Sequence, residues 1–500
     1  MSADRAKAVA AASTEVTTTT SPHLLTGAQY KDSLRDGRRI VYQGEEITDV
    51  PNHPLFKNSV DLWAELYDAQ HRPETADVTT YFDAELGERV STAWLVPRDR
   101  DDLDTRRRLL EFSTDRTLGV FGRPPDYGPT LAMGFLSASH LIEQTEPDAP
   151  GKILDFVNFA RERNLLSTDV IADAQADRTL ATAEMPGRLR CVEERPDGIV
   201  VYGVKPAASG ATIGHWGGIA TLLSPGTDPE ATIWAYVPVN SPGLSFVPRE
   251  GTLTGMENRE DHPLDAQGEE VDAFMFFDHV FIPRERLFSF RNPRTLPLYL
   301  DVAVFPQWAI LARMARRAKI FAATAQLIVD ILGTASIPAV RAVVAEVFAY
   351  AAALESFVLA AEDKGSLTPH GIYVPDRTMV TAGRLHATAN LPNIMQILRE
   401  LCGQGLVSRV TAKDLEHEQI GAWVDEFLPG HNISARGKNK FMNFVWDLTS
   451  SAHASRVNLF ENVNSTPPPA IRQQLYQAYD PSQQVKNLTS FIGLEFTNES

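Results

Sequence analysis

An arginine and a tyrosine four positions apart could bind an anionic oxygen atom. Arg123 and Tyr127 lie in the segment FGRPPDY, residues 121–127. The two prolines fix their own φ angles and disfavour helical backbone in the residue before them, so we expect a stiff turn. Two hydrogen-bond donors on a stiff turn suit an anionic or carbonyl oxygen of a small molecule. A second interpretation stays open, in which Arg123 forms a structural ion pair and Tyr127 is a core aromatic residue.

The composition limits the possible partners of this turn. A chain of 500 residues with 43% hydrophobic and 22% charged residues is typical of a soluble globular protein with two to four structural units. A net charge of -17 and a pI near 5.2 argue against nucleic acid, because phosphate binding needs clustered Lys and Arg. We therefore expect a small-molecule ligand.

Cysteine usage and hydropathy indicate the compartment. Cys191 and Cys402 alone provide neither a disulfide framework nor a multi-thiolate metal site, so we predict no metal and a reducing, cytoplasmic location. Residues 1–22 resemble a frayed tail rather than a signal peptide. No stretch of 18 uncharged apolar residues occurs, which predicts that the chain does not span a membrane.

The elements around the turn divide the chain into three blocks. Residues 23–185 have a mainly helical pattern, with a capped helix starting at 26, a hairpin over 38–48 and further helices over 58–70 and 153–166. Residues 186–300 carry short β-rich runs separated by Gly/Pro/Asp turns, which predicts a β-barrel domain; the runs are 189–204, 219–223, 232–239 and 273–282.

Residues 301–500 complete the pattern with long apolar helices, expected over 308–332, 339–361, 384–401 and 438–463. Such helices pack as a bundle, and their apolar surface predicts a subunit interface and a homotetramer. The fold class is therefore α+β. Helical domain, β-barrel and helix bundle follow each other in the acyl-CoA dehydrogenase-like flavoproteins.

Six motifs narrow this likeness to one family. They are TGAQYKDSLRDGRRIVYQGEEITDV at 26–50, FGRPPDY at 121–127, AQADRT at 174–179, GIVVYGVKPAASGA at 198–211, FFDHVFIPRERLF at 276–288 and FVWDLTSSAHASRVNLFE at 444–461. With these motifs the chain resembles the oxygenase component of the 4-hydroxyphenylacetate 3-hydroxylase family, the two-component FADH2-dependent monooxygenases.

The resemblance implies a reaction. Reduced FAD (FADH2) comes from a separate NAD(P)H flavin reductase and reacts with O2 to a flavin C4a-hydroperoxide, which hydroxylates an aromatic substrate. The chain has no G-x-G-x-x-G after a strand and no G-x-x-x-x-G-K-[ST], which agrees with a separate source of electrons. The ring is phenol-like or a nitrogen heteroaromatic.

The resemblance also assigns residues. It implies that Arg123 and Tyr127 bind the substrate oxygen. It implies flavin contacts at Gln175, Arg178, Ser209, Ser455 and Arg456. Ser209 stands where the family usually has a Thr. For each flavin residue, the role of an ordinary polar residue on the surface or in the core stays open.

One departure from the family concerns catalysis. The family has a His that touches both flavin and phenol, and here the matching text is Ser167-Thr168-Asp169. A carboxylate accepts hydrogen bonds, so Asp169 could act as a base for a phenol or bind the N–H of an indole, pyrrole or aniline-like ring. The start of the last block also differs, with Gln307 in a segment where many relatives carry His. The alternative is that Asp169 pairs with Arg123.

Three other functions share this fold or composition. A CoA-ester dehydratase with flavin and an iron–sulfur cluster needs several cysteines, and only Cys191 and Cys402 are present. An acyl-CoA dehydrogenase-like oxidase would use a carboxylate base on oxidised flavin. A binding protein without catalysis is the third alternative.

Overall fold

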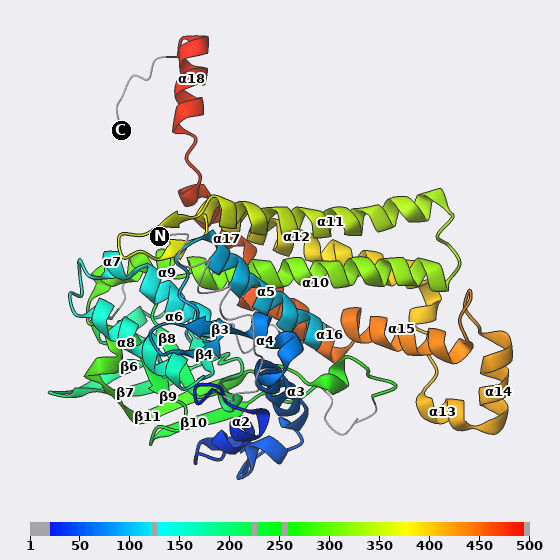
Figure 1. Cartoon of the computed structure of the whole chain (residues 1–500), viewed down its shortest axis with the longest axis horizontal. Helices are drawn as coiled ribbons and strands as arrows, with labels where there is room; N and C mark the ends of the chain where they lie inside the picture. The colour runs from blue at the N-terminus through cyan, green and yellow to red at the C-terminus, as the bar shows by residue number, and fades with distance from the viewer. Residues whose placement is uncertain are drawn as a thin grey trace.

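The structure, a computed structural model, describes residues 21–121, 128–175, 177, 179–222, 228–252 and 259–494. Helices come first, two sheets lie in the middle, and a bundle of long helices packs alongside them (Figure 1). The predicted α+β order of helical region, β-rich region and helix bundle is confirmed. The predicted turn residues Arg123 and Tyr127, and also Arg178, lie outside the described residues.

The N-terminal block is built from short helices. They are α2 (Gly27–Ser33), α3 (Lys57–Asp68), α4 (Pro73–Thr79), α5 (Arg100–Thr117), α6 (Gly128–Ser137), α7 (Ser139–Ile142) and α8 (Ala149–Glu162). Two hairpins interrupt them, formed by β1 (Arg39–Tyr42) with β2 (Glu45–Glu46) and by β3 (Thr80–Asp83) with β4 (Glu88–Ser91). Thr26 caps α2, because its Oγ1 accepts from Gln29 N at 3.2 Å while Gln29 Oε1 accepts from Thr26 N at 2.8 Å. The predicted capped helix and hairpin are both confirmed.

The middle block contains two sheets. The first has the strand order β2-β1-β10-β11-β7-β6, and the second has the order β12-β9-β8-β5. Their remaining strands are β5 (Ser167–Val170), β6 (Arg190–Arg195), β7 (Gly198–Lys205), β8 (Trp216–Ala220), β9 (Ile233–Pro238), β10 (Leu244–Pro248), β11 (Ala273–Pro283) and β12 (Leu287–Phe290). Strands β1 and β5 belong to these sheets although they precede residue 186. The predicted domain boundaries at 185 and 300 therefore remain predictions.

The C-terminal block begins with three long helices that run side by side. They are α10 (Val304–Ile331), α11 (Pro338–Asp363) and α12 (Arg377–Cys402). Shorter elements surround them, namely α9 (Tyr299–Val302), β13 (Ser366–Leu367), β14 (Tyr373–Val374), α13 (Ala412–Glu416), α14 (Glu418–Phe427), α15 (Ala435–Thr449), α16 (Ala452–Leu459), a π-helical turn (Phe460–Asn464), α17 (Pro468–Ala478) and α18 (Ser482–Ile492).

One predicted helix, over 438–463, is wrong as a single element. The chain breaks at Ser450 and Ser451, between α15 and α16. Ser451 has extended backbone, and its Oγ accepts a hydrogen bond from Ala454 N at 3.1 Å. A serine that caps a new helix competes with continuation of the preceding one, which explains the break.

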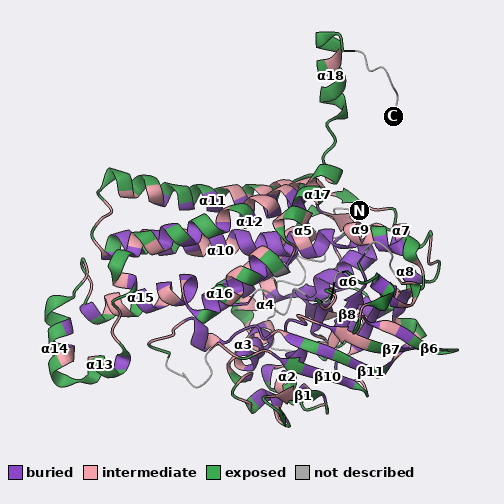
Figure 2. Ribbon diagram, turned by 180° about the vertical axis from the view of Figure 1, so that it is seen from behind, coloured by how far each residue is buried: buried purple, intermediate pink, exposed green. Residues whose placement is uncertain are grey.

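Burial differs between the long helices. Within the described part of the chain, two helical stretches are long and apolar enough to cross a membrane. In the stretch that contains α10, 67% of the most apolar window is buried, compared with 33% in α11. Figure 2 shows the same contrast, with α10 largely buried and α11 exposed along its outer side. Phe348 and Leu359 are among the exposed apolar residues of α11. This surface is available for a partner.

Candidate active site

Asp169 lies in the middle of β5, next to a tyrosine that the sequence did not indicate. Strand β5 pairs with β8 and β8 with β9, so Asp169, Gly218 and Tyr236 form one row across the sheet. A Cβ on Gly218 would come within 2.9 Å of the Tyr236 ring, so glycine makes this close packing possible. Both outer residues are buried, with exposed fractions of 4% for Asp169 and 0% for Tyr236.

The surroundings of Tyr236 in this row determine its protonation state. Burial, and next the negative charge of Asp169, raise the pKa of Tyr236 well above its usual value. Tyr236 is therefore a neutral phenol at physiological pH, and its hydroxyl has no hydrogen-bond partner among the described residues. The only signal in the sequence was the pair Gly217-Gly218 inside a strand, which indicates a close approach of another group.

Phe121 and Gly128 flank the predicted turn and lie near α3 and β5, respectively, whereas Arg123 and Tyr127 themselves are outside the described residues. Phe121 stacks edge-on against Trp63, with ring centroids 5.7 Å apart. Gly128, which follows Tyr127, lies so close to the carbonyl oxygen of Ser167 that an added Cβ would be 1.4 Å from it. Gly128 therefore contacts β5 two residues before Asp169.

Trp63 connects this turn with the loop that contains Ser209. Gly210 has φ +70°, and a Cβ there would be 3.3 Å from the Trp63 ring and 3.9 Å from Thr168 Cγ2. The indole Nε1 of Trp63 is buried and has no hydrogen-bond partner among the described residues. The helical periodicity of the sequence placed Trp63 correctly in the core but gave no indication of this free donor.

Ser209 and Arg456, which lie far apart in the sequence, meet at Asp272. Ser209 Oγ donates to Asp272 Oδ1 at 2.6 Å, and Arg456 donates from Nη2 to the same oxygen at 2.6 Å and from Nε to Oδ2 at 2.9 Å. Burial raises the pKa of Asp272, but the charge and hydrogen bonds of Arg456 lower it to about 2. Arg456 also donates to Glu270 Oε2 at 3.0 Å, whereas its neighbour Ser455 is exposed on α16.

Gln175 follows a largely half-buried segment that is anchored at its beginning. The buried Nζ of Lys205 donates to Ile171 O at 3.1 Å and to Asp173 Oδ1 at 2.6 Å. Arg188 lies 3.5 Å from the other oxygen of Asp173. Two cations thus hold the segment two residues before Gln175, which itself is exposed.

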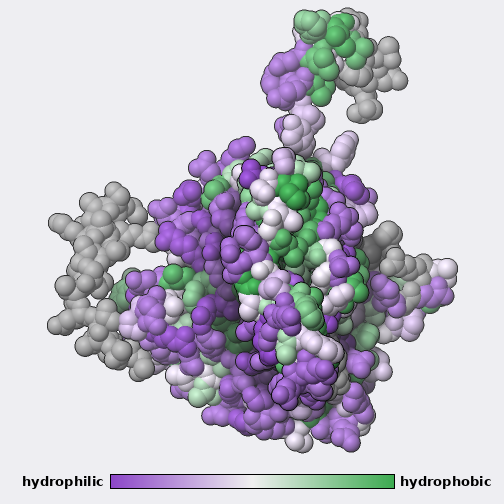
Figure 3. Space-filling view, turned by 90° about the vertical axis from the view of Figure 1, so that its right-hand side faces the viewer, coloured by the Kyte–Doolittle hydropathy of each residue, from purple (hydrophilic) through white to green (hydrophobic). Residues whose placement is uncertain are grey.

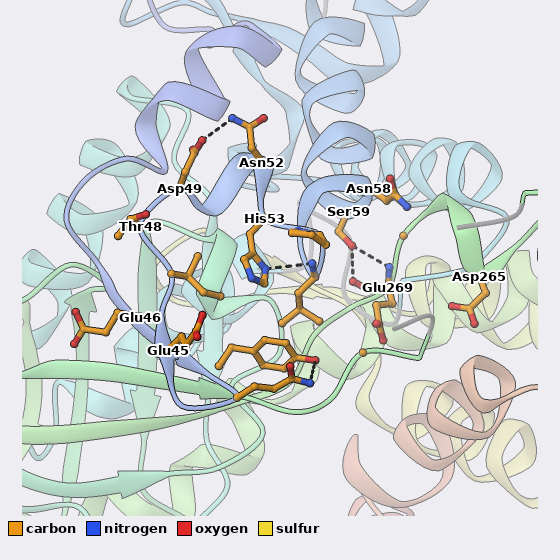
Figure 4. Close-up of a pocket in the computed structure, with 17 residues that line it drawn as sticks. Glu45, Glu46, Thr48, Asp49, Asn52, His53, Asn58, Ser59, Asp265 and Glu269 are labelled. Carbon is orange, nitrogen blue, oxygen red and sulfur yellow. Dashed lines mark hydrogen bonds between the residues drawn. The ribbon is translucent and has the colours of Figure 1, made fainter. Parts of the chain in front are cut away.

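A separate pocket of about 700 Å³ lies between the β1–β2 hairpin, α3 and the segment before β11 (Figure 4). Its carboxylates are Glu45, Glu46, Asp49, Asp265 and Glu269. Ser59 links its two walls, because its Oγ donates to Glu269 O at 2.7 Å and accepts from Glu269 N at 2.9 Å. The predicted site residues that the structure describes do not line this pocket, and its negative charge does not suit a phenolate.

The residues around β5 fit a flavin. Buried polar atoms without a hydrogen-bond partner among the described residues include Trp63 Nε1, Thr168 Oγ1, Thr212 Oγ1 and Tyr236 Oη. Thr168 lies on the face of β5 opposite to Asp169 and Tyr236, because successive strand residues point to opposite faces. Such atoms are costly unless a ligand satisfies them, and an isoalloxazine ring offers both donors and acceptors. Of the predicted residues that the structure describes, Ser209 and Arg456 are brought together, whereas Gln175 and Ser455 are exposed.

Comparisons with known proteins agree with this fit. The N-terminal sequence profile of the 4-hydroxyphenylacetate 3-hydroxylase family matches residues 26–289, and the C-terminal profile matches 298–493. The chain is 32% identical over 461 residues to the 2,4,6-trichlorophenol monooxygenase of Cupriavidus pinatubonensis (strain JMP 134 / LMG 1197), with 90% of this chain and 88% of that protein covered. It is 33% identical over 451 residues to the FADH(2)-dependent monooxygenase TftD of Burkholderia cepacia, with 88% and 87% covered.

Solved structures show the same fold. The oxygenase component of 4-hydroxyphenylacetate 3-monooxygenase, complexed with FAD, superposes with a TM-score of 0.88 at 26% identity and covers 94% of this chain and 98% of that one. An archaeal 4-hydroxybutyryl-CoA dehydratase shares the fold with a TM-score of 0.85 at 19% identity, over 95% and 96% of the two chains. Because the two profiles together span nearly the whole chain, this protein belongs to the 4-hydroxyphenylacetate 3-hydroxylase family and is a flavin-dependent aromatic monooxygenase.

Proposed function

We propose that this protein is the oxygenase component of a two-component monooxygenase that hydroxylates a small aromatic ring bearing an acidic O–H or N–H group. Bound reduced FAD supplies the two electrons with which one atom of O2 enters the ring and the other leaves as water. A separate flavin reductase delivers the reduced FAD. The relatives named for chlorophenol, nitrophenol and hydroxyphenylacetate support an aromatic substrate.

The observation that carries the substrate proposal is the buried carboxylate of Asp169 in the row with Tyr236. A buried carboxylate accepts a proton or a hydrogen bond from the substrate, which makes the adjacent ring carbon more electron-rich. Arg123 donates to the resulting anionic oxygen, and Tyr127 donates a second hydrogen bond. The neutral Tyr236 hydroxyl holds the carboxylate or the substrate in place.

Substitutions at Asp169 test this role. We expect Asp169→Asn to lower hydroxylation of the preferred substrate about a hundredfold, because a general base contributes factors of this size. We expect Asp169→His to gain activity on simple phenols. The measurement is hydroxylated product and hydrogen peroxide formed per O2 consumed, with reduced FAD supplied chemically and a panel of phenols and nitrogen heteroaromatics.

The matched control is Glu46→Gln, which neutralises an exposed carboxylate in the separate pocket and should leave product formation unchanged. Arg123→Lys keeps the charge but loses the planar fork, so we expect a loss of about 2 kcal/mol in transition-state stabilisation and more hydrogen peroxide. If Asp169→Asn hydroxylates every accepted substrate at the unmodified rate and Asp169→His gains nothing on phenols, Asp169 is a structural residue.

We also propose that the chain forms a homotetramer through its helix bundle. The supporting observation is α11, of whose apolar window only 33% is buried within the chain. Large exposed apolar faces mark interfaces between subunits. Light scattering that gives the mass of a single 55.2 kDa chain at micromolar concentration would contradict this proposal.

A further inference from the structure

Helix α18 stands away from the rest of the chain and carries one apolar stripe. None of its 11 residues is buried, and Figure 1 shows it projecting from the end of the bundle near α17. Val485, Leu488 and Ile492 are 46%, 60% and 57% exposed. These positions follow the spacing i, i+3, i+7, with which an amphipathic helix binds in a groove. Because an isolated helix of this length is marginal in water, its stripe needs a partner surface.

A groove of matching chemistry lies at the other end of the bundle. It has a volume of about 430 Å³ and lies where α10 ends and α11 begins. Its apolar lining residues are Val329, Ala335, Val340, Val344 and Phe348. Figure 3 looks onto this end of the molecule and shows apolar side chains gathered there.

The distance along the bundle argues against docking of α18 into the groove of its own chain. Ala478, the last residue of α17, accepts from Thr378 Oγ1 at 3.1 Å, and Asp376 N donates to Ala361 O at 2.8 Å, so α18 starts near the C-terminal end of α11. Val344 lies about 26 Å further back along α11 at 1.5 Å per residue. The chain from Ala478 to the start of α18 spans at most about 14 Å. Only the tip of α18 could reach the groove of its own chain, so the whole apolar stripe could not bind there.

We propose that α18 of one protomer docks in the α10–α11 groove of a second copy of this chain. Two copies whose α11 helices pack antiparallel about a two-fold axis place the α18 of each next to the groove of the other. The exposed side of α11, which includes Phe348 near the middle of the helix and Leu359 near its C-terminal end, lies along this contact. The inference rests on the proposed homo-oligomer and names the segment that holds it together.

Cysteine cross-linking of the full chain tests the contact. In a double variant with Leu488→Cys and Val340→Cys, oxidation should give a covalent dimer of twice 55.2 kDa on a non-reducing gel. The matched control replaces Ser490, which lies on the opposite side of α18, together with Val340, and should give at least tenfold less dimer. The native Cys191 and Cys402 are both buried and should not contribute.

Deletion of residues 481–500 tests the energetic role of the helix. We expect the shortened chain, in light scattering, to dissociate into smaller species at concentrations where the full chain is assembled, while it still binds FAD. The proposal is overturned if the deletion leaves the mass of the assembly unchanged or if the cross-link closes within one chain. It is also overturned if the shortened chain keeps its assembly and loses only binding to a flavin reductase or to lipid vesicles. None of these measurements depends on hydroxylation. A protein that assembles as proposed but does not hydroxylate its substrate would therefore contradict only the proposed reaction.

Discussion

Two clusters of largely buried charges each take one residue from a short segment of the chain, 456–461, and have opposite composition. Arg456 in α16 joins the sheet cluster, which consists of Arg249, Glu269, Glu270, Asp272 and Arg456. Glu461, five residues later in the π-helical turn, joins the bundle cluster, which consists of Arg313, Arg317, Arg384 and Glu461. Carboxylates outnumber arginines in the first cluster, and arginines outnumber carboxylates in the second.

The clusters differ in what they contact. The sheet cluster holds Ser209 through Asp272, so it connects the C-terminal segment to the loop beside Trp63. The bundle cluster connects α10 and α12 to the segment after α16: Arg313 Nη2 donates to Glu461 Oε2 at 3.0 Å, and Arg384 donates to Ser465 Oγ at 2.9 Å. The same segment therefore shapes the candidate site with one residue and stabilises the bundle with another.

The largest expected effect is that of Glu461→Gln on stability. Burial raises the pKa of Glu461, but the charges of Arg313, Arg317 and Arg384 outweigh it and lower the pKa, so the carboxylate is charged in the folded protein. Its removal leaves buried arginines without their counter-charge, which costs about 3–5 kcal/mol. Chemical denaturation should show this loss, while the folded variant binds reduced FAD with unchanged affinity.

The control for Glu461→Gln is Asp425→Asn, which breaks the exposed pair with Arg436 and should cost less than about 1 kcal/mol. If Glu461→Gln is no more destabilising than this control, the bundle cluster does not hold the helices together.

The next largest effect is expected for Asp272→Asn, which should weaken ligand binding as well as stability. The loss of a charge-assisted acceptor for Ser209 and Arg456 costs about 2 kcal/mol of stability, with Glu270 still in contact with Arg456. We expect the dissociation constant of reduced FAD, measured by anaerobic titration, to rise about tenfold. A dissociation constant that does not change while stability falls would mean that the sheet cluster is as purely structural as the bundle cluster.

His215, a half-buried histidine that directly precedes β8, gives a pH-dependent effect of similar size. His215 Nδ1 accepts from Leu166 N at 2.9 Å, so Nε2 carries the proton and lies 2.7 Å from Ser33 Oγ. Burial, and next the charge of Arg38, lower the pKa of His215 from 6.5 to about 3. The unfolded chain therefore binds a proton below pH 6.5 that the folded protein does not bind, and stability falls as the pH is lowered from 6.5 towards 3.

Between pH 7 and pH 5 this single group should remove about 2 kcal/mol of stability. His215→Gln should be less stable at pH 7 but should lose less between the two pH values, which denaturation at both would show. An equal pH dependence of the two proteins would mean that His215 is already protonated in the fold.

The smallest effect is expected for Ser455→Ala. Ser455 is exposed and lies beside Arg456 without being part of the sheet cluster, so its loss should change stability by less than about 0.5 kcal/mol. If its hydroxyl contacts the flavin, one neutral hydrogen bond is lost, and the dissociation constant of reduced FAD should rise about fivefold. An unchanged constant would leave Ser455 an ordinary surface residue.

Much of the fold could be predicted because the signals are local. The capping box at Thr26 and Gln29, the hairpin that ends at Glu46 and the long apolar helices depend on residues close together in sequence. The edge strand β5 was not predicted, because four residues are too few for periodicity to show. The break at Ser451 was missed because serine serves equally as a helix surface residue and as a cap.

By itself the sequence determined the order of helical, β-rich and bundle regions and the family, whereas the correspondence of Asp169 to a family histidine remains a prediction. Only the tertiary structure decided that Asp169 shares a row with Tyr236, that the buried Trp63 Nε1 has no hydrogen-bond partner among the described residues, and that Ser209 and Arg456 meet at Asp272. The physical reason is that these contacts join residues from 63 to 456, and pairing across strands and packing between helices leave no periodic trace in the sequence. Local sequence patterns specify the helices and strands, and the packing of these elements brings the residues of the candidate site together.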